Sequence, residues 1–488
     1  METLPYVDAD PASASPTARP AVAAAVPALL MLVVGSIGVT GRQVWQDELA
    51  TWWASTISWA EFRELLGHND VVLAPYYLFM RAWVAVFGDS ALALRTQALL
   101  AMAAAAAMTA ALGGRLFGAR IGLVAGVVFT LLPGITRYAQ EARPYALVMA
   151  GVTGSALLLL RAVERPGPAR WTAYAATGAL TTALHPLALP FLLAHAAWAW
   201  RRGRAGAFLP AGAVAAAPGL ASLWAARGQT GQVSWIDTPW WALFSVLGEL
   251  LFSYLLPLVV VAAVAAAVVR RRRTEPDAVW LLAIWSWAPI LLLYALRPVQ
   301  DLFVPRYLLY VLPAWAVLAA VTLVDLHGAA ARRWSPGTVR AVGTAGLVLL
   351  AALALPGHRD ARADPAWQPD LRALAGVVAA RQQPGDAIVF GGSSWNERLS
   401  LRYHLRGAAA PRDAFLALPE SRGTYAAAEC GRACLGEAPR IWLVVVAGAD
   451  DPLAGLPTEK AGPLRDGYTV AETFPARLVR LVLLVRRT

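Results

Sequence analysis

The sequence predicts a polytopic α-helical membrane protein that carries a small α/β domain after its last span. Of its 488 residues, 58% are hydrophobic and 15% are charged, whereas an ordinary soluble protein has about 25% charged residues. Up to Pro356, long apolar runs alternate with short arginine clusters. Beyond Pro356 the sequence changes to short apolar strands separated by helix-like stretches.

The basic residues follow the pattern of a membrane topology. The chain has 42 basic and 31 acidic residues, a net charge of +11. Basic clusters between apolar runs are typical of cytoplasmic loops and unlike a nucleic-acid groove, so we expect no nucleic-acid partner. The clusters are Arg115/Arg120, Arg201/Arg202/Arg204, Arg270–Arg273 and Arg332/Arg333.

Apolar runs and arginine clusters together define about eleven spans. Residues 1–20 are polar and rich in Pro, Ser and Ala, so we expect a disordered cytoplasmic tail. The run after them is long enough to cross a bilayer and lacks the basic start of a cleaved signal. The expected spans are 21–40, 91–113, 121–138, 144–161, 171–185, 186–200, 206–225, 246–269, 278–296, 307–325 and 338–356.

The first outer loop, residues 41–90, is long and aromatic. Its stretches "ELATWWASTISWAEFRELL" and "APYYLFMRAWVAVFG" are amphipathic, which predicts helices lying in the membrane interface. The alternative treats 71–87 as a true span. It would place the basic segment "GRLFGAR" outside, against the positive-inside rule.

Residues 357–488 are expected to form an α/β domain outside the membrane. Strand-like "AIVFGG", "IWLVVVAG" and "RLVRLVLLVRR" follow helix-like "DLRALAGVVAARQ". The segment has no Walker loop, dinucleotide fingerprint or zinc motif, so we expect a binding or positioning role. Cys430 and Cys434 form either one local disulfide or two unpaired thiols.

The stretch "RYAQEARPYALVM" places three charges between two apolar runs. Arg137 and Glu141 are four residues apart and can pair. Pro144 suits the first turn of the next span, which puts Arg143 at an outward-facing corner. The positive end of that helix, with Arg143 beside it, favours an anion.

Arg306 adds a second arginine at the outer boundary, directly after Pro305. Two arginine forks suit phosphate oxygens. The acidic pair Asp47 and Glu48 in the first loop can supply a general base. A lipid phosphate held by arginines beside a carboxylate base fits glycosyl transfer from a polyprenyl-phosphate sugar.

The chain also resembles a known family. "WQDELATWW", "APYYLFMRAWVAVFGDSALALR", "GRLFGARIGLVAG" and "RYAQEARPYAL" occur in the order and spacing of glycosyltransferase family 39-like enzymes. These belong to the membrane GT-C superfamily and are similar to dolichyl-phosphate-mannose mannosyltransferases. The resemblance is strong over residues 40–200 and weaker to 330. It implies the GT-C fold, mannose as the sugar, and Asp47 as catalytic base.

Two further features bear on that resemblance. The alanine-rich, lysine-poor chain resembles the actinobacterial branch, which builds cell-wall mannans and arabinans. Many family members carry His-Pro-Pro before the paired tyrosines, where this chain has Leu73-Ala74-Pro75. The role of that histidine does not transfer, and His68 is the candidate replacement.

These observations predict an inverting glycosyltransferase of the plasma membrane with an extracytoplasmic active site. Its donor is a polyprenyl-phosphate sugar, and its acceptor is a glycolipid, polysaccharide or protein of the cell envelope. Asp47 is the expected base, with Glu48 as its alternate or as an acceptor-binding group. The expected phosphate-binding residues are Arg143, Arg306 and Arg137, and the supporting or acceptor-binding residues are Glu141, Tyr138, His68, Asp70, His185 and Tyr307.

Alternatives stay open at this point. A lipid-linked sugar transporter or flippase would also carry charges in its membrane region, although these charges gather at one face. A polyprenyl-phosphate-arabinose-dependent arabinofuranosyltransferase and an inactive scaffold are further readings. The mechanism requires no cofactor, but Asp47, Glu48, His68 and Asp70 could together bind a divalent metal.

Overall fold

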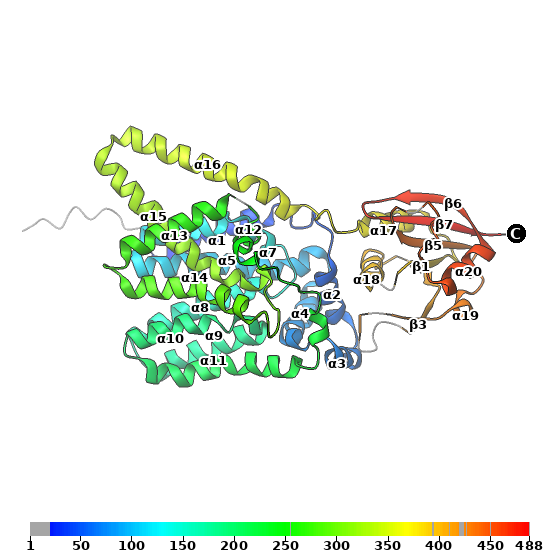
Figure 1. Ribbon diagram of the computed structural model, residues 1–488, viewed down its shortest axis with the longest axis horizontal. Coiled ribbons are helices and arrows are strands. Elements are labelled where there is room, and N and C mark those ends of the chain that lie inside the picture. The colour runs from blue at the N-terminus through cyan, green and yellow to red at the C-terminus, as the bar shows by residue number, and fades with distance from the viewer. Residues whose placement is uncertain are drawn as a thin grey trace, which may run out of the picture.

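A computed structural model describes residues 20–253, 255–392, 395–408, 410–418, 424–425, 427–448 and 450–487. The expected disordered tail lies outside these residues except for Pro20, which begins the first helix. Figure 1 shows a helical bundle with the strand-containing domain at one end, beyond helices α2 and α4.

The bundle is built from helices joined by short turns. Its central helix α5 packs against α1, α6 and α8. The helices are α1 (Pro20–Ser36), α5 (Ala91–Phe117), α6 (Ala119–Leu131), α7 (Pro133–Ala139), α8 (Tyr145–Glu164), α9 (Pro168–Leu184), α10 (Phe191–Arg201), α11 (Ala205–Ala226), α12 (Ala242–Leu251), α13 (Leu256–Arg271), α14 (Pro276–Leu296), α15 (Leu312–Arg333) and α16 (Pro336–Arg362), with short 3₁₀ helices η3 (Pro186–Ala188), η4 (Thr230–Val233) and η5 (Pro305–Val311).

Six helices in the described part of the chain are long and apolar enough to cross a membrane, or up to eight if each bent pair is one span. This establishes a multi-pass membrane protein but falls below the expected eleven. The difference lies in α1, α9 and α10, which have 17, 17 and 11 residues. A straight crossing needs about 20. The last span is also longer than expected, because α16 continues through Pro356 to Arg362.

Two expected spans are bent, and both bends lie near the candidate site. Helices α6 and α7 meet at 67°, and α12 and α13 meet at 101°. Leu132 is extended (ψ 125°) before Pro133, as expected for a residue that precedes proline. Phe252 adopts a left-handed conformation at the end of α12. The bends turn α7 and α12 toward the end of the bundle that carries the strand-containing domain (Figure 1).

The segment 41–90 forms short helices where the sequence analysis expected interface helices. They are α2 (Gln46–Thr56), α3 (Trp59–His68) and α4 (Ala74–Phe87), with η2 (Val71–Leu73) between the last two. Ser58 and Glu61 make a reciprocal capping box at the start of α3. At 14 residues α4 is too short to span, which disfavours the alternative reading of 71–87.

At the opposite end of the bundle, arginines from the sequence clusters pair with acids across neighbouring helices. Arg115 at the end of α5 contacts Glu164 at the end of α8, with 2.5 Å between Nη2 and Oε2. Arg201 pairs with Asp277 at 2.7 Å. These charges are partly exposed, so each pair contributes about 0–1 kcal/mol.

The C-terminal segment forms an α/β domain around a five-stranded sheet of order β2-β1-β5-β7-β6. Strand β1 is parallel to β2 and β5, and β7 is antiparallel to β5 and β6. Alternate side chains face the two sides, so each face has its own apolar core. The elements are α17 (Leu371–Arg381), β1 (Ala387–Phe390), α18 (Trp395–His404), β2 (Arg412–Asp413), β3 (Leu416–Leu418), β4 (Ala428–Glu429), α19 (Arg432–Leu435), β5 (Arg440–Val446), α20 (Thr458–Gly467), β6 (Tyr468–Pro475) and β7 (Val479–Arg486).

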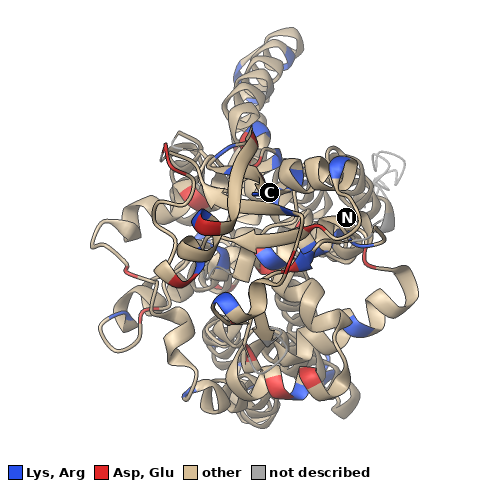
Figure 2. Cartoon of the chain, turned by 90° about the vertical axis from the view of Figure 1, so that its right-hand side faces the viewer, with Lys and Arg blue, Asp and Glu red and all other residues tan. Residues whose placement is uncertain are grey.

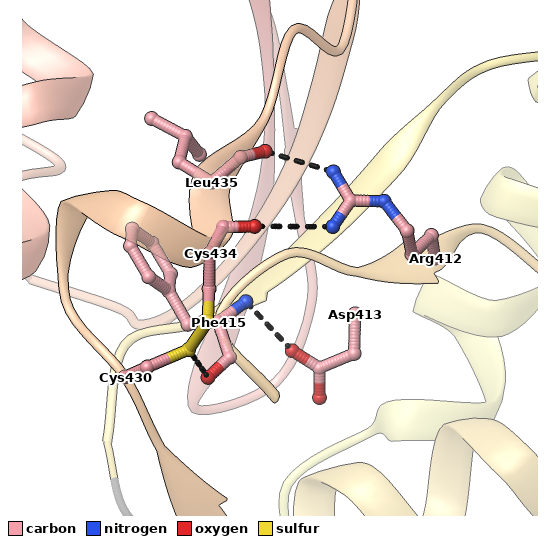
Figure 3. Close-up of a disulfide and its surroundings, with 6 residues drawn as sticks. All are labelled: Arg412, Asp413, Phe415, Cys430, Cys434 and Leu435. Atoms are coloured by element: carbon pink, nitrogen blue, oxygen red, sulfur yellow. Dashed lines mark hydrogen bonds between the residues drawn. A yellow bond between two sulfur atoms is a disulfide. The ribbon is translucent and has the colours of Figure 1, made fainter. Parts of the chain in front are cut away.

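Cys430 and Cys434 form a disulfide beside this sheet, with 5.9 Å between their Cα atoms. Figure 3 shows Arg412 reaching from β2 to the same turn, where its guanidinium donates to the carbonyls of Cys434 and Leu435. The first of the two alternatives for these cysteines is therefore the observed one.

Candidate active site

Asp47 lies in the first turn of α2, at the end of the bundle that carries the C-terminal domain. Its Oδ2 atom is 4.0 Å from Arg143 Nε and 3.9 Å from Arg306 Nη2. Arg143 also donates to the backbone carbonyl of Asp47 at 3.3 Å. The Asp47 side chain is 20% exposed. The structure therefore brings together one accessible carboxylate and two arginines from distant parts of the sequence.

The two arginines keep donor capacity that no described residue uses. The Nε atoms of Arg143 and Arg306 are buried and have no hydrogen-bond partner among the described residues. A buried guanidinium N–H without a partner is costly, so each such atom needs an explanation. Arg306 also lies over the rings of Trp45, Trp235 and Tyr307. The two arginines therefore have N–H groups available to bind an anion.

Glu48 has a different environment from its neighbour Asp47. Its side chain is fully buried and accepts two hydrogen bonds from Arg95, at 2.9 and 2.7 Å. It also accepts from the backbone N–H of Ala142 at 2.9 Å. Thr51 adds a bond to the Ala142 carbonyl. Glu48 therefore ties α2 to α5 and to the turn that carries Arg143.

Arg137 and Glu141 form the predicted ion pair at 2.7 Å. Glu141 lies beyond the end of α7, in the turn before α8, and its carboxyl oxygens are buried without a hydrogen bond of good geometry to any described residue. Burial raises the pKa of Glu141 to about 7, and the Arg137 guanidinium opposes the rise. Arg137 also lies over Trp45 and Tyr138. Both Arg137 and Arg306 therefore lie near the Trp45 ring, each 5.9 Å from its centroid.

Aromatic side chains form one wall of the site. Tyr145 lies edge-on to Tyr138, with 5.5 Å between ring centroids. It is also 5.8 Å from His185 and 6.3 Å from Tyr307. His185 and Tyr307 are 5.1 Å apart. Three residues predicted as supporting groups thus gather around Tyr145, which the sequence analysis did not select.

The first-loop residues His68 and Asp70 do not join Asp47 and Glu48. His68 is exposed, and its ring contacts the Glu64 carbonyl at 3.0 Å. Asp70 accepts hydrogen bonds from two tyrosines. No group of three or more His, Cys, Asp or Glu residues within the described part of the chain is placed to hold a metal ion. The four-residue metal site left open by the sequence is therefore not assembled in this structure.

A groove opens beside Arg306. It has a volume of about 760 Å³ and lies between α12, the start of η5 and α16. Apolar side chains such as Phe252, Leu255 and Leu353 line it, and Arg306 and Tyr138 lie in its wall. Glu249 and Asp360 line it as well. An apolar channel that includes Arg306 suits a lipid with a phosphate head.

Several residues of the site were missed by the sequence analysis. Arg95 lies in the predicted span 91–113, where it anchors Glu48 and donates to the backbone carbonyls of Val39, Arg42 and Gln43. A charge within a predicted span is itself a functional signal, which could have found it. Tyr425 approaches the site from the C-terminal domain, and no local signal in the sequence points to it. Figure 2 views the molecule from this end.

No protein-family model matches the sequence, and no curated protein sequence matches it. Among solved structures, ArnT from Cupriavidus metallidurans in the apo state has a TM-score of 0.55 at 14% identity, covering 94% of this chain and 97% of ArnT. ArnT bound to undecaprenyl phosphate has a TM-score of 0.53 at the same identity and coverage. The Archaeoglobus fulgidus oligosaccharyltransferase in the apo form reaches 0.49 at 12% identity, covering 87% of this chain and 69% of that one.

The likeness to ArnT confirms the predicted fold class. This chain has the same fold as ArnT, the GT-C fold expected from the sequence, with a small strand-containing domain at its C-terminal end. At 14% identity the likeness concerns the fold, so activity is argued from the site.

Proposed function

We propose that this protein is an inverting glycosyltransferase that moves a sugar from a polyprenyl-phosphate donor to a cell-envelope acceptor. The observation that carries the proposal is the group formed by Asp47, Arg143 and Arg306. One partly exposed carboxylate faces two guanidinium groups whose Nε atoms are buried without a partner among the described residues. This arrangement offers a base for a hydroxyl and a binding site for a phosphate.

In the proposed reaction the acceptor hydroxyl attacks the anomeric carbon of the donor sugar. The new bond joins the acceptor oxygen to that carbon, and the bond from the carbon to the phosphate oxygen breaks. The electron pair passes to the phosphate, whose growing charge Arg143 and Arg306 stabilise. Asp47 takes the hydroxyl proton. Because attack and departure occur on opposite faces, the configuration inverts.

The remaining charged residues act by positioning these three. Glu48 is assigned as a positioning residue, because its carboxylate is used by Arg95 and by the Ala142 N–H. It fixes the turn that presents Arg143. Arg137 is paired with Glu141 at 2.7 Å, and it makes no ion pair with Asp47 within the described part of the chain. We therefore assign Arg137 a weaker effect on the donor than Arg143.

The groove of about 760 Å³ is assigned to the donor lipid, since Arg306 lies in its wall. The structure of ArnT with undecaprenyl phosphate supports a lipid-phosphate ligand for this fold. Mannose is the sugar favoured by the sequence resemblance. Tyr138, Tyr145, His185 and Tyr307 are assigned to the wall around the transferred sugar.

The proposal is tested with the purified full chain in detergent and a panel of donors and acceptors. Polyprenyl-phosphate sugars, including mannose and arabinose, are each combined with glycolipid, polysaccharide and peptide acceptors, and products are read by mass spectrometry. One donor is expected to be consumed with formation of an inverted glycoside. If intact lipid moved across vesicle membranes and no product formed, the protein would be a transporter rather than an enzyme.

The active site is proposed to face away from the cytoplasm. The disulfide suits an oxidising compartment, and the arginine clusters gather at the opposite end of the bundle. A membrane-impermeant thiol reagent should label Glu64→Cys, an exposed position of α3, in intact cells. It should reach Arg120→Cys, exposed at the opposite end, only after permeabilisation. The reverse labelling pattern would show that the topology is opposite to the one proposed.

A further inference from the structure

Asp70 forms a link between the membrane region and the C-terminal domain. Its Oδ2 atom accepts a hydrogen bond from Tyr77 of α4 at 2.7 Å and another from Tyr425 at 2.7 Å. The two hydroxyl oxygens are 3.3 Å apart. Tyr425 comes from the C-terminal domain and stacks on Trp395, the first residue of α18, with 5.0 Å between ring centroids. Three polar groups from two domains therefore converge on one point.

The backbone at Asp70 is held in an unusual conformation. Its φ of 55° lies in the left-handed region, which is sparsely populated by residues other than glycine. Two side chains of the η4 segment hold it there. Gln232 accepts from the Asp70 N–H and Gln229 accepts from the Val71 N–H, both at 3.1 Å. Strained backbone positions that are held in place by several neighbours are often found at functional sites. This conformation therefore suggests a functional role for Asp70.

Asp70 also belongs to the electrostatic surroundings of the candidate active site. Against the effect of burial, the negative charges of Asp47 and, more weakly, Asp70 raise the pKa of Arg143. The second carboxylate oxygen of Asp70, Oδ1, takes no hydrogen bond from any described residue, and the side chain is partly exposed. Neither Asp70 nor the two tyrosines line the groove assigned to the donor lipid. A carboxylate repels a phosphate but accepts hydrogen bonds from hydroxyl groups.

We propose that Asp70, Tyr77 and Tyr425 form a subsite for hydroxyl groups of the acceptor saccharide, with the C-terminal domain supplying Tyr425. The inference rests on the proposed function and deepens it: the acceptor portion held here is a neutral polyhydroxylated sugar. Asp70 Oδ1 accepts from one sugar hydroxyl. The partly exposed oxygen of Tyr425, which donates to Oδ2, accepts from a neighbouring hydroxyl, and the buried Tyr77 holds Asp70 in place. The C-terminal domain is thus part of acceptor selection.

The test compares Tyr425→Phe with Tyr468→Phe in the full-length protein. Both variants lose one tyrosine hydroxyl in the same domain, but Tyr468 donates to the Ala438 carbonyl within the sheet region and away from Asp70. Transfer from polyprenyl-phosphate-mannose to octyl α-mannoside gives separate KM values for donor and acceptor. Binding of octyl α-mannoside without donor is followed by saturation-transfer NMR.

Tyr425→Phe should raise the acceptor KM and Kd about tenfold, as for loss of a hydrogen bond at a charged group, with the donor KM and kcat unchanged. Tyr77→Phe should act the same way, and Tyr468→Phe should leave both acceptor constants at the wild-type value. Equal acceptor constants in Tyr425→Phe and wild type would overturn the subsite. A parallel fall in kcat and in the affinities for donor and acceptor would also overturn the subsite, because it would show that Tyr425 has only a structural role.

The two proposals fail in different ways. If the wild type binds octyl α-mannoside and Tyr425→Phe weakens that binding, but no donor in the panel is consumed, the glycosyltransferase proposal fails and the saccharide subsite stands. If transfer occurs and Tyr425→Phe leaves the acceptor constants unchanged, the enzyme stands and the subsite fails.

Discussion

The two ends of the helical bundle use arginine in opposite ways. At the end far from the C-terminal domain, Arg115 and Arg201 each reach an acid on a neighbouring helix at 2.5 and 2.7 Å and are 33% and 40% exposed. At the other end, Arg143 and Arg306 are 11% and 20% exposed and lie about 4 Å from the Asp47 carboxylate they share, at 4.0 and 3.9 Å.

This difference separates charges that set topology from charges that do chemistry. An exposed, paired arginine adds about 0–1 kcal/mol to stability and marks the basic side of the membrane. A buried guanidinium with an unpaired N–H costs stability. Of the two pairs of arginines compared here, Arg143 and Arg306 carry such an unpaired N–H. This is expected of a site that binds an anion.

The largest expected effect on stability is at Glu48. Glu48→Ala leaves Arg95 buried without its partner, so unfolding free energy should fall by about 3–5 kcal/mol. Glu164→Ala, at the opposite end, should change it by about 0–1 kcal/mol because that pair is exposed. Thermal denaturation in detergent measures both. Equal shifts in the two variants would remove the contrast between the ends.

Next in size are the effects on donor binding. Arg143→Gln and Arg306→Gln should each raise the donor KM about 10–100-fold, because each removes a charge-assisted contact to phosphate worth about 1.5–3 kcal/mol. Arg137→Gln should have a smaller effect, since Arg137 is already paired with Glu141. Arg201→Gln is the matched control and should stay within about twofold.

A further prediction concerns pH. Burial raises the pKa of Glu141 to about 7 from its ordinary 4.5. The stability that this group contributes is therefore complete below about pH 4.5 and is lost as the pH rises through about 7. The melting temperature of the wild type should fall relative to Glu141→Gln between about pH 5 and about pH 8. Parallel curves for the two proteins would show that Glu141 titrates normally in the fold.

Much of the fold was predictable because apolar runs, prolines and arginine clusters are local signals. The boundaries of α5, α8 and α11 follow them closely. The count of spans was less predictable, because α9 and α10 are too short to cross alone. The sheet order, with β5 between β1 and β7, depends on pairing between strands far apart in sequence.

The site was predictable where charged residues interrupt or border apolar runs. It was unpredictable where it depends on contacts between residues far apart in the sequence. The motif "DE" identifies two acids but does not show which of them is the base. The structure distinguishes them, because Glu48 is buried and paired with Arg95, whereas Asp47 faces Arg143 and Arg306. The predicted pair of Arg137 and Glu141 is local and is confirmed. Pairing between residues as distant as Asp70 and Tyr425 leaves no trace in a single sequence.

The central claim is that Asp47 is the base that activates the acceptor. The direct test measures sugar transfer by Asp47→Asn with saturating polyprenyl-phosphate-mannose and octyl α-mannoside. Glu164→Gln serves as the control, and a folding check uses melting temperature. The account predicts a loss of about 10²–10⁴-fold in kcat for Asp47→Asn, an unchanged donor KM within about threefold, and wild-type rates for the control. Wild-type kcat in Asp47→Asn would contradict it.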